Sequence, residues 1–235
     1  MNTTEIYLLA SSITLLTVYH LYLIWMIKHH PLRTDLGINS CARGAWVRNM
    51  MRRAPDVLVI QTLRNSLMSA SFLASTAILL VAGLLSFTLT NKNNLENFDH
   101  VLNVLSNGHP HVALSRLLLL VLTFFFAFFN FVLAVRYYSH AGFLLNAANN
   151  EDGHALPEQF MIASLKRGAF HFTLGMRAFL FSLPFGLWLL GPVWLLLGSI
   201  LLVLVLWKID FPKHTGIPSN ECFVGKGYCE PGKAD

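Results

Sequence analysis

A strongly apolar stretch decides the fold class of this chain: residues 117–135 read LLLLVLTFFFAFFNFVLAV, without a single charged side chain. Wound as an α-helix at 1.5 Å per residue, the stretch is about 28 Å long. That length is just enough to cross a hydrocarbon core of about 30 Å. The stretch therefore predicts a transmembrane helix.

Three further charge-free windows lie at residues 6–27, 65–91 and 178–207. With flanking turns, the four membrane spans are expected over about 6–27, 59–90, 114–145 and 178–207. The last window contains Pro184, Gly186, Gly191 and Pro192. Because proline removes a backbone donor and crowds the preceding turn, we expect one bent helix here. The alternative is a re-entrant pair of half-helices.

The composition agrees with a membrane protein. Of the 235 residues, 54% are hydrophobic and 12% are charged, about half the charge usual in a soluble domain. The net charge is +5, but the basic residues adjoin apolar runs, so no nucleic acid is expected as a partner. We predict an all-α, polytopic integral membrane protein of the plasma or inner membrane. Its four-helix domain covers residues 1–210, and residues 211–235 form a tail.

The Lys/Arg bias of short loops predicts the orientation. The loop after the first span is rich in basic side chains and is expected in the cytoplasm: Lys28, Arg33, Arg43, Arg48, Arg52 and Arg53. Four spans then leave both termini outside the cytoplasm. Cys222 and Cys229 bracket a short segment of this extracytoplasmic tail, which is compatible with a disulfide; a metal pair is the alternative.

The segment between the third and fourth spans has a pattern of its own. Apolar residues recur at helical spacing through residues 157–176, while Lys166, Arg167 and His171 occupy other faces. Pro157 suits a first helical turn. We expect an amphipathic helix on the cytoplasmic membrane surface, attracted to anionic lipids. It could run on into the fourth span.

Several short strings occur together in a recognisable order. They are Tyr19-His20, the QTLRN string at 61–65, Arg136, the FLLN string at 143–146, Arg167-Gly168, the GMRAF string at 175–179, Pro184, Trp188, Gly191 and Pro192. The set resembles domain-of-unknown-function family 599 (DUF599), four-span membrane proteins of bacteria and plants, over roughly residues 1–210. The resemblance implies the fold and the membrane location. It implies no activity.

Polar side chains within the spans are the candidate site. In the expected topology they gather in the cytoplasmic half: His20, Gln61, Arg64, Asn65, Arg136, His140 and Arg177. No Asp or Glu lies inside the four predicted spans, so the arginines are expected to meet an anionic guest, a lipid headgroup or backbone carbonyls. The simpler interpretation is that each arginine reaches out to the headgroup layer.

A haem or metal site is a more distant hypothesis. His20 and His140 are the one pair that could face each other across a bundle as axial haem ligands, but neither spacing nor flanking sequence requires it. We expect no cofactor.

A stripe of small and polar residues on the second span is expected to pack inside the bundle: Gln61, Asn65, Ser69, Thr76 and Gly83. A substrate channel is the alternative. The chain lacks a phosphate-binding glycine loop, an HExxH motif and a GxSxG motif, so we expect no enzyme. The first functional hypothesis is an accessory or scaffold subunit, or a homo-oligomer, in contact with other membrane chains and anionic lipids. The second is a protein that binds or transports an anionic small molecule or lipid headgroup through its Arg/His cluster.

Overall fold

The computed structural model describes residues 3–51, 57–90, 110–147 and 158–211, and these residues are almost entirely helical, with no strand among them. The elements in chain order are α1 (Thr3–His29), the short 3-10 helix η1 (Pro31–Arg33), α2 (Asp35–Met51), α3 (Val57–Thr90), α5 (Pro110–Ala147), α6 (Glu158–Trp188) and α7 (Pro192–Asp210). Of these, α2 was not predicted: it occupies part of the expected first loop.

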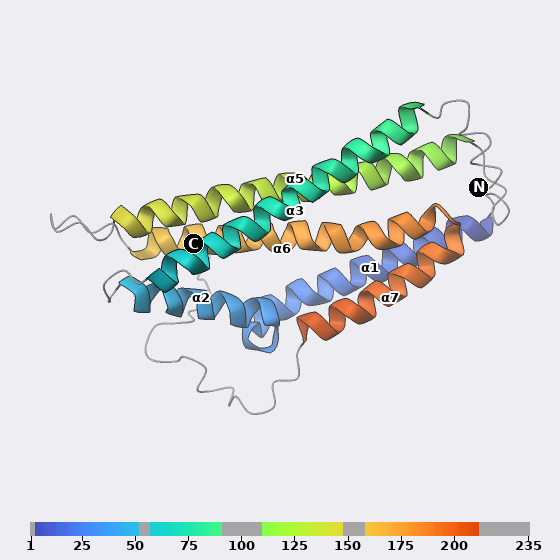
Figure 1. The fold of residues 1–235 in the computed structure, drawn as a ribbon. Helices are drawn as coiled ribbons and strands as arrows, with labels where there is room; N and C mark the ends of the chain where they lie inside the picture. The colour runs from blue at the N-terminus through green and yellow to red at the C-terminus, as the bar shows by residue number, and fades with distance from the viewer. Residues whose placement is uncertain (1–2, 52–56, 91–109, 148–157, 212–235) are drawn as a thin grey trace.

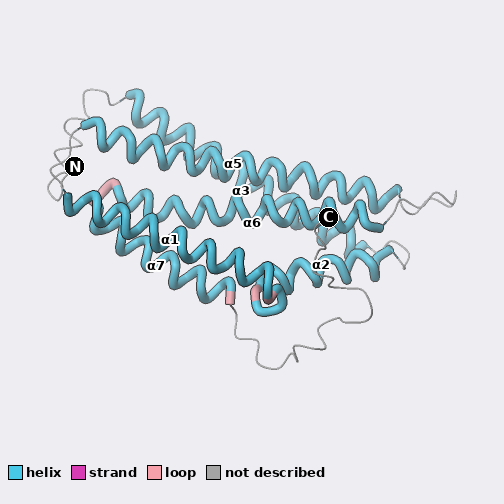
Figure 2. Tube along the Cα trace, turned by 180° about the vertical axis from the view of Figure 1, so that it is seen from behind, coloured by secondary structure: helices cyan, strands magenta, loops and turns pink. Residues whose placement is uncertain are grey.

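Five long helices, α1, α3, α5, α6 and α7, run roughly along one axis (Figure 1). The helices α1 and α7 lie side by side and begin at the same end of the bundle, as the reverse view also shows (Figure 2). The helices α3, α5 and α6 continue past the other ends of α1 and α7, and α2 packs against α6 in this extension. The bundle thus has a longer layer, formed by α3, α5 and α6, and a shorter layer, formed by α1 and α7.

Four of the helices are long and apolar enough to cross a membrane: residues 6–29, 57–88, 114–145 and 192–210. Large apolar side chains such as Tyr7, Phe72 and Leu201 stand exposed on the outside of the bundle. Such a surface is stable only in contact with lipid or another apolar partner. The chain is therefore an all-α polytopic membrane protein, as expected.

The predicted single helix over 178–207 is wrong. The helix α6 ends at Trp188, a tight turn follows, and α7 begins at Pro192. Gly191 in this turn has φ 140°, a conformation that glycine reaches without steric cost, and Pro192 occupies the first helical turn, where it has no hydrogen bond to lose. Pro184 stays inside α6. Leu180 and Phe181 of α6 pack beside Leu202 and Leu206 of α7, so the two helices form an antiparallel hairpin.

The segment predicted as a surface helix is the first half of α6, and the alternative that it runs on into the predicted fourth span is confirmed, because α6 continues to Trp188. Its periodicity is real, because Met161, Leu165 and Ala169 form one buried face. That face packs against α5 rather than lipid, while Lys166 and Arg167 are exposed. A 3.6-residue apolar period indicates a buried stripe and does not identify its partner, which is why the sequence alone suggested the membrane surface.

The helix α3 packs against α5, and the face it uses is not the predicted one. Its buried residues are Val59, Leu63, Ala70, Ala74, Ala77 and Val81. The expected packing stripe lies beside this face and is largely uncovered: Gln61, Asn65, Ser69 and Gly83 are exposed and Thr76 is half-buried. Alanines take the role that was assigned to the polar residues, because alanine also lets helix backbones approach closely.

Candidate functional site

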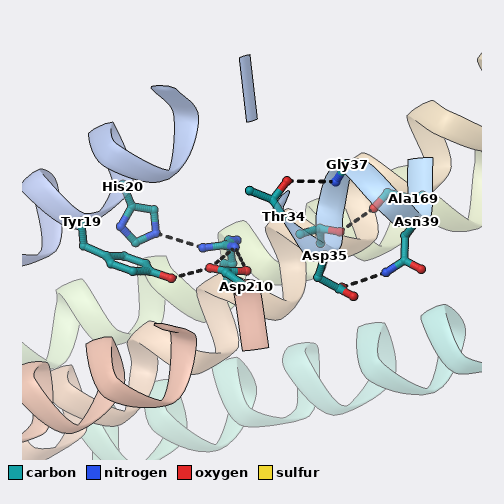
Figure 3. Close-up of polar contacts among 10 residues, drawn as sticks. Tyr19, His20, Thr34, Asp35, Gly37, Asn39, Ala169 and Asp210 are labelled. Carbon is teal, nitrogen blue, oxygen red and sulfur yellow. Dashed lines mark hydrogen bonds and ion pairs between the residues drawn. The ribbon is translucent and has the colours of Figure 1, made fainter. Parts of the chain in front are cut away.

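A buried ion pair joins α6 to α7. The guanidinium of Arg177 donates through Nη2 to both carboxylate oxygens of Asp210, at 2.7 and 2.8 Å. The two side chains are only 12% and 4% exposed. The Tyr19 hydroxyl of α1 donates to Oδ2 of the same carboxylate at 2.5 Å, so three helices meet at Asp210 (Figure 3).

His20 completes this cluster. Its Nδ1 lies 2.8 Å from the Leu16 carbonyl, which can only accept a hydrogen bond, so Nδ1 carries the proton. The unprotonated Nε2 then faces Nη1 of Arg177 at 3.4 Å and accepts from it. We name Tyr19, His20, Arg177 and Asp210 the polar clamp. Every charged group in it has a partner, as a low-dielectric environment requires.

A cavity of about 570 Å³ lies further along the bundle, where α2 meets the extension of α3, α5 and α6. Its volume falls within the range of small-ligand sites. The described lining residues are Asn39, Ala42, Arg43 and Trp46 of α2, Thr62, Leu63, Asn65, Ser66 and Ser69 of α3, Tyr138 of α5, and Leu165 and Phe172 of α6. Among them Arg43 carries the one charge, and none is Asp or Glu.

The first turn of α2 fixes the wall of this cavity that holds Asn39. Thr34 caps the helix, because its Oγ1 accepts from the Gly37 backbone N–H at 3.3 Å. Asp35 Oδ2 accepts from Asn39 Nδ2 at 2.8 Å (Figure 3). Arg43, two turns further along α2 than Asp35, lines the same cavity as Tyr138 of α5. The site is positively charged and rich in hydrogen-bonding groups.

Residues 7–215 match the family described as protein of unknown function, DUF599. The chain belongs to the DUF599 family. No curated protein and no solved structure matches it.

In this DUF599 protein, the predicted site residues do not form one cluster. His20 and Arg177 belong to the polar clamp, and Asn65 lines the cavity. The remaining four predicted residues are exposed and belong neither to the polar clamp nor to the cavity lining: Gln61, Arg64, Arg136 and His140. The haem hypothesis is not supported either, because the His20 imidazole is engaged by Leu16 and Arg177 while His140 is exposed on α5.

The prediction that Arg177 lacks a carboxylate partner in this DUF599 chain is wrong. Asp210 lies just beyond the predicted fourth span, which ended at residue 207, so it was not counted among the residues of the spans. The structure continues α7 to Asp210 and, through the hairpin, returns that end of α7 to Arg177. The sequence signal was present, since Asp210 stands three residues after the apolar run that ends at Trp207, but the partner of Asp210 became visible only with the hairpin.

Other site residues of the DUF599 fold were missed for a similar reason. Arg43 was counted among the basic loop residues, and Tyr138 and Trp46 were not singled out; the cavity that unites them is formed by α2. Within the described ranges, no group of three or more His, Cys, Asp or Glu side chains could hold a metal ion. Cys222 and Cys229 lie outside the described residues.

Proposed function

We propose that this DUF599 protein is a non-catalytic multi-pass protein of the plasma or inner membrane that binds an anionic ligand in the cavity between α2, α3, α5 and α6. The observation that carries the proposal is the cavity lining. It combines the guanidinium of Arg43 with amide and hydroxyl groups, and it includes no carboxylate among the described residues. A lining of this charge favours an anion over a cation.

The position of the cavity supports access from the cytoplasm. Basic side chains gather at the end of the bundle where α2 lies, among them Lys28, Arg33, Arg48, Lys166 and Arg167, and short basic segments face the cytoplasm. Arg116 stands at the opposite end of α5. We therefore assign the end with α2 and the cavity to the cytoplasmic side.

The same assignment makes α6 a fifth membrane crossing. The helix α7 has 19 residues, about 28 Å at 1.5 Å per residue, and its antiparallel partner in the hairpin is the second half of α6. Arg177 of that half is paired with Asp210, and His171, shortly before it on α6, lies 3.1 Å from Asn130 of α5. With five crossings, α1 starts outside the cytoplasm and α7 ends inside it. The four-span prediction had placed both termini outside.

A catalytic role is not proposed, because the described lining offers no His, Cys, Asp or Glu to act as base or nucleophile. The accessory-subunit and homo-oligomer hypotheses stay predictions, as does contact with other membrane chains. Arg64 and Arg136 are exposed and lie outside the cavity lining, so they take no part in the proposed ligand site.

Thermal unfolding of the full chain in detergent tests the proposal. Glycerol 3-phosphate at 100 times its dissociation constant should stabilise the wild type by about 2.7 kcal/mol. The Arg43→Gln variant should lose this response because the cavity loses its charge. Arg64→Gln is the matched control: it removes an exposed arginine from the same end of the bundle and should respond like the wild type. An equal response of the two variants would reject Arg43 as the anion contact.

A further inference from the structure

We propose that the occupant of the cavity is a phospholipid of the cytoplasmic leaflet whose phosphate headgroup carries free hydroxyl groups, as in phosphatidylglycerol. This inference rests on the proposed function and specifies its ligand. Three independent features of the described residues lead to it: the depth of the cavity in the membrane, the hydrogen-bonding state of its hydroxyl groups, and the exposed face of α3 that continues from it.

Aromatic and basic residues mark the depth of the inner membrane interface. Tyr22 of α1 stacks on Trp207 of α7 with ring centroids 5.6 Å apart, and exposed Lys208 and Lys28 lie close by in the chain. Tryptophan, tyrosine and lysine at one level are typical of the headgroup region. The polar clamp lies at this level as well, because Asp210 follows Lys208 by two residues.

The cavity lies just to the cytoplasmic side of that level. On α6, the lining residues Phe172 and Leu165 precede Arg177 by 5 and 12 residues, which is about 7 and 18 Å along the helix axis. Arg177 itself reaches along this direction to Asp210 at the end of α7. The wall of the cavity nearest the polar clamp, at Phe172, therefore borders the phospholipid headgroup layer, which is several ångströms thick, and the wall at Leu165 lies on the cytoplasmic side of it.

The three hydroxyl groups of α3 that line the cavity are arranged as hydrogen-bond acceptors. Thr62, Ser66 and Ser69 each donate their own proton to the backbone carbonyl four residues earlier, at 2.8, 3.1 and 2.9 Å. Their oxygen lone pairs are left for the cavity. A ligand that satisfies both sides of the site must offer an anion to Arg43 and hydrogen-bond donors to the α3 hydroxyls. A phosphate group esterified to glycerol offers both.

The charge of the lining also separates this headgroup from choline. Trp46, Tyr138 and Phe172 are the aromatic residues that a quaternary ammonium would require. However, Arg43 stands among them, and no carboxylate occurs in the described lining to offset its repulsion of a second cation. Phosphatidylcholine, which has the phosphate but lacks the free hydroxyls, is therefore the discriminating comparison.

The face of α3 beside the cavity leads toward the membrane interior. Ser69 lies at the cavity. It is followed on the same face by Thr76, which is half-buried, and by Gly83, which is exposed. Leu73 and Leu80 lie on the same side of the helix, so an acyl chain along this face would meet an apolar surface. A soluble anion would make no use of it, whereas a lipid places its headgroup and its chains in continuous contact with α3.

Native mass spectrometry of the full chain, released from nanodiscs with equal amounts of phosphatidylglycerol and phosphatidylcholine, tests the inference. The wild type should retain phosphatidylglycerol at least tenfold more often than phosphatidylcholine. Arg43→Gln should lose most of this preference, Arg43→Lys should keep part of it, and Arg64→Gln should keep all of it. Circular dichroism identifies a variant that fails to fold. In that case Ser66→Ala, which removes one acceptor without removing charge, replaces it and should lower retention of phosphatidylglycerol alone.

The outcomes separate this inference from the proposed function. Equal retention of the two lipids by the wild type, together with an Arg43-dependent response to glycerol 3-phosphate, overturns the lipid and keeps a soluble anion as the ligand. A preference for phosphatidylglycerol that survives Arg43→Gln overturns the site. If neither the lipid nor glycerol 3-phosphate depends on Arg43, the inference and the proposed function both fail.

Discussion

At the scale of single residues, Asp210 determines how the charge of Arg177 is accommodated between packed helices. An unpaired arginine between packed helices would cost several kcal/mol of desolvation. The carboxylate of Asp210 takes two hydrogen bonds from Arg177 and one from Tyr19. The polar clamp therefore holds α1, α6 and α7 together. Its main effect is that loss of one side chain leaves the side chain that it paired with buried and without a partner.

Substitution Asp210→Asn should destabilise the chain by about 3 kcal/mol, since it leaves the Arg177 charge buried without a counter-charge. Thermal or denaturant unfolding in detergent measures the loss. The double variant Arg177→Met with Asp210→Leu should recover most of it, because an apolar pair has no charge to desolvate. Lys208→Gln, on the exposed side of the same turn, should change stability by less than about 0.5 kcal/mol. Equal losses for Asp210→Asn and Lys208→Gln would contradict a structural ion pair.

Substitution Tyr19→Phe should cost less, about 1 kcal/mol, because Asp210 keeps both hydrogen bonds from Arg177 when the phenol hydroxyl is removed. The same unfolding assay ranks it below Asp210→Asn. A loss for Tyr19→Phe as large as that for Asp210→Asn would mean that the hydroxyl, rather than the ion pair, holds the three helices together.

At the scale of elements, the contact between α5 and α6 depends on glycine. A Cβ atom on Gly175 would stand 2.7 Å from the Phe131 ring, and Phe131 is fully buried. Two helical turns earlier, a Cβ on Gly168 would stand 2.9 Å from the Tyr138 ring. The two glycines lie seven residues apart on one face of α6, so aromatic rings of α5 lie directly against its backbone.

Substitution Gly175→Ala should destabilise the chain by about 1–3 kcal/mol, because a buried ring cannot move aside without disturbing its own packing. Gly142→Ala on α5 is the control. A Cβ there meets nothing within 4 Å, and alanine is favoured over glycine in a helix by up to about 1 kcal/mol, so this variant should be stabilised. Unfolding midpoints in detergent compare the two, and a shift of the same sign for both would argue against close packing at Gly175.

The hairpin between α6 and α7 is held at its turn by a residue of a third helix. Arg116 of α5 is buried, its Nη1 donates to the Trp188 carbonyl at 3.4 Å, and its guanidinium lies 5.4 Å from the centroid of the Trp188 ring. A cation near the last carbonyls of α6 also interacts favourably with the helix dipole. The end of α6 is thus fixed against α5 before the chain turns into α7.

At the scale of the whole molecule, the number of crossings decides where the ends of the chain lie. The helix α1 starts at the end of the bundle that carries the hairpin turn, and α7 ends at the opposite side (Figure 1). Five crossings follow if α6 spans the membrane with its hairpin partner. The predicted disulfide between Cys222 and Cys229 depended on an extracytoplasmic tail, so it does not follow from this topology.

Single cysteines introduced at Thr3 and at Lys208, in a chain whose three native cysteines are replaced by serine, should label from opposite sides. A membrane-impermeant maleimide should reach the Thr3→Cys position in intact cells and the Lys208→Cys position only after permeabilisation. Labelling of both positions in intact cells would restore the four-crossing topology and exclude α6 as a span.

The sequence by itself determined the membrane class, the all-α fold, the helices around residues 6–27, 59–90 and 114–145, and the DUF599 membership. These depend on length, apolar content and local order of residues, which act within one helix. The tertiary structure alone decided the hairpin at Gly191, the pairing of Arg177 with Asp210, and the cavity around Arg43. Hydropathy averages over a window, so it could not show that Arg177 of α6 is paired with Asp210, 33 residues further along the chain. A charge is costly in a membrane only when it is unpaired, and pairing is a property of the folded bundle.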